Sequence, residues 1–283
     1  MSLPPLLHRL LQHPAAASLA DLDSAEATAL HERMLRDKTF LRKLYCAFYE
    51  DFAAASRRAP ANGLRIEIGA GSGFLPEVLP GVRTLDLRPG ARVGLRASAL
   101  DLPLADSSVS CLFLLDVLHH LPDAAAFLAE ALRVLMPDGR LVLIEPYNSI
   151  WARVIYKRLH PEPFDETQLG WRLDAGGPMT AANQALPWII LVRDRPRFEA
   201  MFPGLVLEDL RPHTILLYLL SGGLSMRALA PGFLFEPLRE IETALLARAS
   251  RQLATMMTAE LRKDVNSLAR TGMGGVLRSA GGS

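Results

Sequence analysis

Glu67-Ile68-Gly69-Ala70-Gly71-Ser72-Gly73 is the stretch of sequence that decides the fold. It follows an alternating apolar run at 64–68, which predicts a strand, and it precedes an apolar run at about 74–79, which predicts a helix. Glycines at such a corner let the backbone approach a ligand closely, because any side chain would block the approach. We therefore expect residues 67–73 to form a ligand-binding loop at the end of a strand.

The sequence on either side of this loop alternates strand and helix signals, which predicts a parallel sheet with crossover helices. Residues 109–115 are apolar almost without interruption, as expected of a central strand that is covered on both faces. We therefore predict an α/β fold with a Rossmann-like, doubly wound sheet. The expected strands are 64–68, 83–87, 109–115 and 141–145, and the expected helices are 74–79 and 124–135.

The sheet unit begins near Pro60, in a run of turn residues, and we place the whole unit at residues 59–221. Residues 1–58 carry apolar side chains at helical spacing, which predicts a helical N-terminal segment. Residues 147–187 combine aromatic and loop-forming residues. We expect them to form an insertion, or lid, over the sheet.

Beyond the insertion the sheet pattern resumes. A helix at 195–201 and strands at 205–210 and 214–220 predict that an antiparallel hairpin finishes the sheet. Residues 222–283 predict a helical C-terminal extension that ends in a mobile Gly/Ser-rich tail.

Composition narrows the function. With 31 basic and 30 acidic side chains the net charge is +1, so we expect no nucleic-acid partner. The two cysteines, Cys46 and Cys111, lie far apart without His or Cys at ligand spacing, so we predict neither a disulfide framework nor a metal site. The N-terminus lacks a charged region before its apolar stretch, and the apolar runs are short for a membrane span, which predicts a cytoplasmic protein.

The glycine spacing excludes one class of ligand site. The dinucleotide fingerprint Gly-x-Gly-x-x-Gly fails, because its last position holds Phe74 or Pro76. The pattern acidic-x-Gly-x-Gly-x-Gly instead resembles motif I of the class I S-adenosylmethionine-dependent methyltransferases. Residues 100–109, 115–123 and 132–141 are similar to that family's "D-x-x-x-LPF-x-D-x-S-F", "VLHHL-x-D" and "L-R-V-L-K-P-G-G" stretches. The resemblance is collinear over about residues 60–147.

This resemblance implies S-adenosyl-L-methionine as cofactor. Asp86, at the end of the second expected strand, is suited to accept hydrogen bonds from both ribose hydroxyls. The family's adenine-contacting Asp falls on Ser98, so that bond would come from Ser98, from the backbone at Ala99 or from Asp101. A second departure is Ser110, which stands where an acid commonly opens the fourth strand. The cofactor residues we predict are Glu67, Gly69, Ala70, Gly71, Gly73, Asp86, Leu87, Ser98, Ala99, Asp101 and Asp116.

A methyltransferase needs a general base only when its acceptor atom still carries a proton. His119 and His120 follow the strand expected at 109–115, and an imidazole titrates near neutral pH. Glu145 ends the strand expected at 141–145, and Tyr147 follows it. These residues are our candidate bases or substrate-orienting groups. Alternatively, one imidazole packs on the cofactor and the other caps the next helix.

The acceptor is expected to be a small or lipid-linked molecule, methylated on oxygen, carbon or nitrogen. The insertion and the apolar run at 216–235 could together wall a hydrophobic pocket. The apolar run could instead pair two subunits of a homodimer or contact a membrane surface peripherally. One alternative is a methyltransferase-like subunit that binds the cofactor without turnover. A nucleic-acid methyltransferase is disfavoured by the charge and by the lack of an Asn/Asp-Pro-Pro-Tyr motif at residues 116–119.

Overall fold

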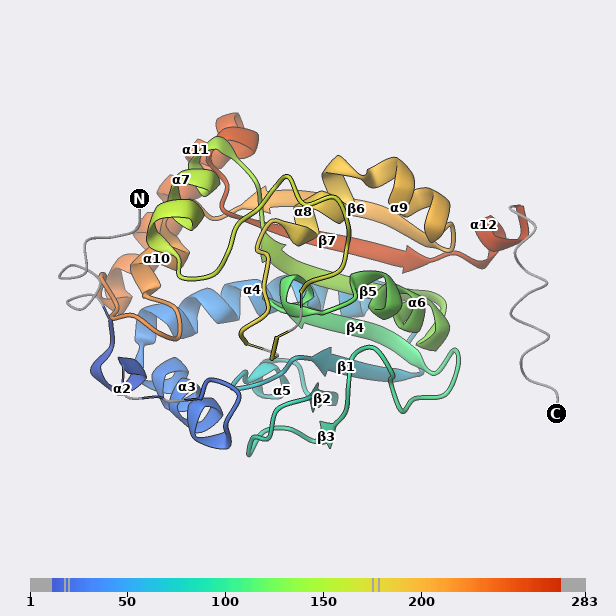
Figure 1. Cartoon of the computed structure of the whole chain (residues 1–283), viewed down its shortest axis with the longest axis horizontal. Coiled ribbons are helices and arrows are strands. Elements are labelled where there is room, and N and C mark those ends of the chain that lie inside the picture. Colours follow the sequence, from blue (N-terminus) through green and yellow to red (C-terminus); the bar gives the residue numbers. More distant parts are fainter. Residues whose placement is uncertain (1–11, 18, 20, 175, 178, 271–283) are drawn as a thin grey trace.

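The computed structural model describes residues 12–270 except residues 18, 20, 175 and 178. Within that part of the chain, a seven-stranded sheet lies at the centre, in the order β3-β2-β1-β4-β5-β7-β6 (Figure 1). Strands β1 to β5 run parallel, whereas β7 is antiparallel to both of its neighbours. The strands are β1 (Leu64–Ile68), β2 (Val82–Asp86), β3 (Leu95–Arg96), β4 (Val109–Leu115), β5 (Leu135–Pro146), β6 (Leu205–His213) and β7 (Met256–Lys263).

Strand β4 lies in the middle of the sheet and is buried on both faces. Its Leu112 and Leu114 pack into one hydrophobic cluster, and its Cys111 and Phe113 pack into another on the opposite face. Alternate side chains of a strand point to opposite faces, so helices must cover both sides. The predicted Rossmann-like fold, mostly parallel with an antiparallel end, is confirmed.

The N-terminal helices cover one face. Helix α4 presents Phe40, Leu44, Phe48 and Phe52 at helical spacing, and these side chains are buried. The Phe52 ring stacks on Phe113 of β4, with ring centroids 4.9 Å apart. The helices on this side of the sheet or at its end are α2 (Pro14–Ala17), α3 (Ala25–Asp37), α4 (Thr39–Arg58), α5 (Leu75–Val78), α10 (Leu217–Ser221), η3 (Gly232–Leu234) and α11 (Phe235–Leu253).

The opposite face is covered by helices from the middle of the chain. Phe127, Ile190 and Phe198 pack in the larger hydrophobic cluster against β4, β5 and β7. The insertion begins with a helix and continues as a loop that is pinned to the sheet unit at several points, such as the Ala124 N–H to Trp171 oxygen bond of 3.1 Å. The helices of this layer are η1 (Leu118–His120), α6 (Ala124–Val134), α7 (Ile150–Leu159), α8 (Leu186–Trp188), η2 (Ile189–Arg193) and α9 (Arg195–Met201).

The predicted hairpin is placed wrongly at its second strand. Residues 214–220 do not form a strand. They form a turn followed by α10, because the buried carboxylate of Glu242 in α11 accepts the N–H groups of Ile215, Leu216 and Leu217. The first N–H groups of a helix have no carbonyl acceptor within the helix, so the Glu242 carboxylate supplies the acceptor that they lack.

The partner of β6 is instead β7, in the segment that we predicted to be helical throughout, so that prediction is wrong for Met256–Lys263. Helix α12 (Val265–Arg270) follows β7, and the predicted tail at 271–283 lies outside the described residues. Among the described helices, none combines the length and the apolar character that crossing a membrane requires.

Candidate active site

The glycine loop joins β1 to α5 in a conformation that only glycine adopts without strain. Gly69 has φ +67° and Gly71 has φ +46°, both in the left-handed region. A Cβ on Gly69 would lie 2.4 Å from the Val117 side chain, and one on Gly71 would lie 2.9 Å from the Arg88 guanidinium. Both positions are therefore closed to side chains by backbone angle and by space.

Asp86 is the last residue of β2, and its carboxylate is hydrogen-bonded to this loop. Its Oδ2 accepts the Gly71 N–H at 2.8 Å, and its Oδ1 accepts the Arg88 N–H at 2.7 Å. The carboxylate is buried, and the Arg88 guanidinium lies 3.7 Å from Oδ1. A carboxylate oxygen has room for more than one donor. Asp86 can thus position the loop and still accept hydroxyl groups of a ligand.

The loop opens onto a cleft of about 840 Å³ at the carboxyl ends of β1, β2 and β4, part of it open to solvent. This is the edge at which open α/β sheets bind their ligands. Gly176, Gly177, Met179 and Ala181 of the insertion line its other side, and the Met179 N–H donates to Asp23 at 3.0 Å. Six of the predicted cofactor residues line the cleft: Gly69, Asp86, Leu87, Ser98, Ala99 and Asp116.

The other predicted cofactor residues lie behind or beside the cleft lining. Glu67, Ala70, Gly71 and Gly73 form the inner side of the loop, where a Cβ on Gly73 would lie 3.0 Å from the Tyr49 hydroxyl and 3.2 Å from Glu67 Oε1. Asp101 is exposed, and its N–H donates to the Ser98 carbonyl. Of the three predicted sources of an adenine contact, Ser98 and Ala99 reach the cleft lining and Asp101 does not.

Glu67 is a buried acid with one oxygen lacking a partner among the described residues. Burial, assisted by the nearby charge of Asp86, raises its pKa to about 8. Between pH 4.5 and pH 8, the Glu67 carboxyl is therefore protonated in the folded protein and ionised in the unfolded chain. The free energy of unfolding should fall as pH rises through that window.

Glu67→Gln should remove this fall. The free energy of unfolding of the variant, measured relative to that of the wild type, should be on the order of 2 to 5 kcal/mol higher at pH 9 than at pH 5. The reason is that the wild type has to ionise a buried carboxyl as the pH rises and the variant does not. Urea unfolding at both pH values measures the difference. The same experiment on Glu50→Gln, whose side chain is 72% exposed, should show little pH-dependent gain. Equal behaviour of the two variants would contradict the assignment.

Asp116 follows β4 with φ +55°, unusual for a residue with a side chain. Burial raises the pKa of its carboxyl to about 7. Its Oδ2 accepts the Tyr218 hydroxyl at 3.0 Å. Tyr218 is a site residue that our sequence analysis missed, although it belongs to the apolar run predicted to close a pocket. Leu217, its neighbour, packs in the core beside α4 instead.

The candidate base Glu145 is fully buried at the end of β5 and already has its partners. Oε1 accepts the N–H groups of Val117 and Leu118 at 2.9 and 2.6 Å, and Oε2 lies 2.7 Å from His119 Nδ1. Glu145 therefore shapes the turn after β4 and orients His119. Tyr147 is also buried, and its N–H donates to the Thr255 carbonyl at 2.8 Å. Neither residue lines the cleft.

His119 and His120 differ in the direction of their pKa shifts and in their access to the cleft. Burial alone would lower the pKa of His119, but the carboxylates of Glu145 and Glu162 outweigh it and raise that pKa to about 10. His120 lines the cleft, and its Nδ1 donates to the Ala181 carbonyl at 3.1 Å. Burial, together with the charge of His119, lowers the pKa of His120 to about 4, so its ring is neutral at pH 7. Of the candidate bases, His120 reaches the cleft.

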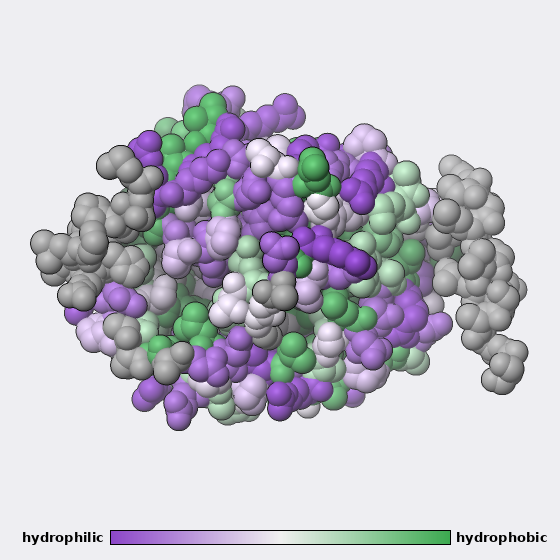
Figure 2. All heavy atoms as spheres, in the orientation of Figure 1, coloured by the Kyte–Doolittle hydropathy of each residue, from purple (hydrophilic) through white to green (hydrophobic). Residues whose placement is uncertain are grey.

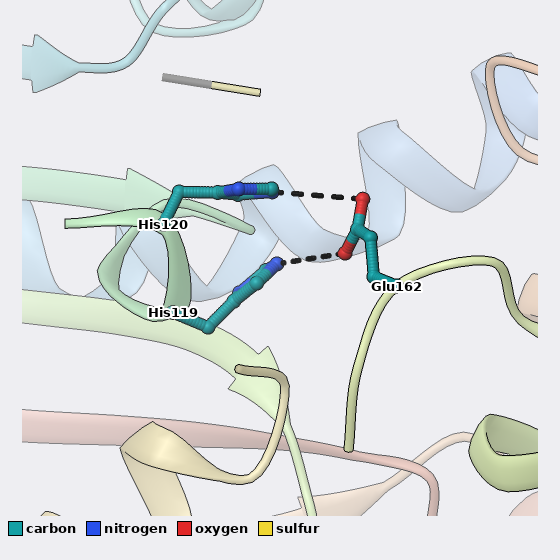
Figure 3. A group of neighbouring side chains, drawn as sticks. All are labelled: His119, His120 and Glu162. Atoms are coloured by element: carbon teal, nitrogen blue, oxygen red, sulfur yellow. Dashed lines mark ion pairs between the residues drawn. The ribbon is translucent and has the colours of Figure 1, made fainter. Parts of the chain in front are cut away.

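Glu162 is a second residue that the sequence analysis did not single out for the site. It comes from the insertion and directs its carboxylate at both histidines, as Figure 3 shows. Its Oε2 also accepts the Gln184 side-chain amide at 2.9 Å. The only sequence signal for it was its place among charged residues of the predicted lid.

Comparison with family models gives a match that runs from β1 to β5. Residues 66–143 match a family model described as "Methyltransferase domain". An uncharacterized methyltransferase of a Mycobacterium species is 34% identical over 104 residues, which are 32% of this chain and 41% of that protein. The chain therefore spans about two fifths of the length of this relative. The 27-O-demethylrifamycin SV methyltransferase of Amycolatopsis mediterranei is 45% identical over 47 residues, 17% of each chain.

Among solved structures, geranyl diphosphate C-methyltransferase from Streptomyces coelicolor, in complex with Mg²⁺, geranyl diphosphate and S-adenosyl-L-homocysteine, is similar at 14% identity. The match covers 87% of either chain, with a TM-score of 0.43.

Proposed function

Since residues 66–143 match a methyltransferase domain, we propose that this protein is a class I methyltransferase that binds S-adenosyl-L-methionine in the cleft and methylates a small-molecule or lipid-linked acceptor. One observation carries the proposal: the left-handed Gly71 donates its N–H to the buried Asp86, and Asp86 lines the cleft together with the left-handed Gly69. A glycine loop held on a carboxylate that lines the cleft fits an adenosyl ligand.

In this proposal each cleft segment has a part. Asp86 accepts the ribose hydroxyls, while Ser98 and Ala99 border the adenine. Gly69 and Asp116 lie toward the methionine end, and His120 faces the acceptor. The cofactor supplies an activated methyl group on a sulfonium, which an acceptor nucleophile takes as the carbon–sulfur bond breaks. The protein's own work is to align the acceptor with that bond and to exclude water.

The insertion supports a small acceptor. Gly176, Met179 and Ala181 close the cleft opposite the glycine loop, and the rest of the lining is largely apolar, with Leu100, Leu121 and Pro122 among it. A mostly apolar cleft with a few polar groups is typical of small-molecule sites.

The competing function is a subunit that binds the cofactor without turnover. The discriminating experiment incubates the protein with S-adenosylmethionine and a panel of phenols, carboxylic acids, amines and prenyl compounds, and follows release of S-adenosylhomocysteine. We expect release that depends on one acceptor class and is lost in Asp86→Ala. Tight cofactor binding with no release over the whole panel would favour the non-catalytic subunit.

The exposed apolar side chains bear on the predicted partners. Ile150 of α7 and Ile241 and Leu245 of α11 are exposed, and Figure 2 shows hydrophobic side chains gathered over these helices at the upper left. Elsewhere this face mixes hydrophilic and hydrophobic side chains. This patch would suit the predicted homodimer or peripheral membrane contact, and sedimentation of the protein with and without lipid vesicles distinguishes the two.

A further inference from the structure

The pair of histidines after β4 and Glu162 of the insertion form a cluster that the proposed function does not explain. In Figure 3 both imidazoles turn toward the same carboxylate. His119 Nε2 lies 3.5 Å from Glu162 Oε2, and His120 Nε2 lies 3.7 Å from Oε1. We propose that His119, His120 and Glu162 bind a divalent transition-metal ion, such as Zn²⁺, at the wall of the cleft.

The spacing of the three ligand atoms fits such an ion. Nitrogen and oxygen ligands lie about 2.0 to 2.2 Å from Zn²⁺ at tetrahedral angles, so neighbouring ligand atoms are about 3.3 to 3.6 Å apart. The distances of 3.5 and 3.7 Å join the two histidine nitrogens to the two different oxygens of Glu162, and one ligand atom from each residue lies within 4.8 Å of the other two. Small side-chain rotations would complete the geometry without moving the backbone.

The outer partners of the histidines present both Nε2 atoms as ligands. His119 Nδ1 donates to Glu145 at 2.7 Å, and Glu145 also accepts two backbone N–H groups, as an ionised carboxylate does. His120 Nδ1 donates to the Ala181 carbonyl, which can only accept. In the neutral rings the protons are then on Nδ1, and both Nε2 lone pairs face Glu162. Histidines that bind metals generally hold their second nitrogen in this way.

With both rings neutral, three acceptor groups converge, and a cation between them would satisfy all three. In the absence of a metal, a proton on His119 would fill this role. Two imidazoles and one carboxylate favour a transition metal over Mg²⁺ or Ca²⁺, which prefer oxygen ligands. Three protein ligands leave a coordination position open, as in catalytic zinc sites. The second cluster, Asp116 with His119 and Glu145, is a poorer candidate because Glu145 already accepts hydrogen bonds on both oxygens.

This inference revises the sequence prediction that no metal is bound. That prediction considered cysteines with His or Cys at ligand spacing, whereas Glu162 reaches the histidines only through the fold of the insertion. Binding of the ion does not depend on the proposed methyl transfer. Its role in the reaction, by contrast, rests on the proposed function. His120 lines the cleft, so an acceptor oxygen could bind the ion there and lose its proton more easily.

The test is a titration of chelator-treated full-length protein with Co²⁺, followed by visible absorption, and then with Zn²⁺ as competitor. We expect one equivalent of Co²⁺ to give the intense bands of a tetrahedral nitrogen–oxygen site and Zn²⁺ to displace it. Glu162→Gln and His120→Ala should each weaken Co²⁺ binding by at least about tenfold to a hundredfold, because each removes one ligand.

The matched control is Glu166→Gln. Glu166 lies on the same segment, but its carboxylate pairs with Lys157 at 2.7 Å, so Co²⁺ affinity should be unchanged. Thermal melts of each variant verify folding, and His120→Ala serves if Glu162→Gln does not fold. Absence of saturable Co²⁺ binding by the wild type, or equal affinity in Glu162→Gln, His120→Ala and Glu166→Gln, would overturn the proposal. S-adenosylhomocysteine binding, measured separately, shows whether the proposed function fails with it.

Discussion

Gly71→Val is expected to abolish cofactor binding while the sheet stays folded. A β-branched residue is strongly disfavoured at φ +46°, and its Cβ would lie 2.9 Å from the Arg88 guanidinium and 3.6 Å from Asp86 Oδ2. The loop would have to move away from Asp86 and lose the Gly71 N–H hydrogen bond. Strain of about 1 to 3 kcal/mol, added to the displacement of the loop from Asp86, should lower affinity more than about a hundredfold.

Calorimetric titration with S-adenosylhomocysteine measures this loss, and circular dichroism verifies the fold. Gly170→Val is the matched control, because Gly170 has no positive φ and its Cβ would meet nothing closer than 4.0 Å. That variant should bind like the wild type. Unchanged binding by a folded Gly71→Val protein would mean that the ligand lies elsewhere.

Asp86→Ala is expected to weaken cofactor binding by about ten- to a hundredfold, equivalent to about 1.5 to 3 kcal/mol. The variant loses the charged acceptor for the ribose hydroxyls. It also leaves the N–H groups of Gly71 and Arg88 without their acceptor, so the loop is less well ordered before binding. The control is Asp106→Ala, since Asp106 is 77% exposed and pairs with Arg133. Equal affinities of the two variants would remove Asp86 from the site.

The parallel half of the fold and its glycine loop could be predicted because their signals are local. The loop follows a strand directly, and Asp86 and Asp116 each end a strand, so chain order alone brings them to one edge of the sheet. The antiparallel end depends on distant contacts. Glu260 of β7 is buried and pairs with the buried Arg140 and the exposed Arg58, and such a charged strand resembles a surface segment until its partners are known.

The part of the site that the sequence did not reveal comes from segments with no motif. Tyr218 reaches Asp116 only because Glu242, in a later helix, turns the chain before α10. Glu162 meets His119 only through the loop of the insertion. An apolar run can form either a strand or a helix, and here a buried carboxylate decides between them.

In our proposal this cleft binds the adenosyl cofactor on the glycine loop and Asp86. S-adenosylhomocysteine, the product of methyl transfer, binds without an acceptor, so isothermal titration of the wild-type protein with it measures this binding alone. We expect saturable binding at one site per chain, weakened about ten- to a hundredfold by Asp86→Ala. A folded wild-type protein that gives no saturable binding would contradict it.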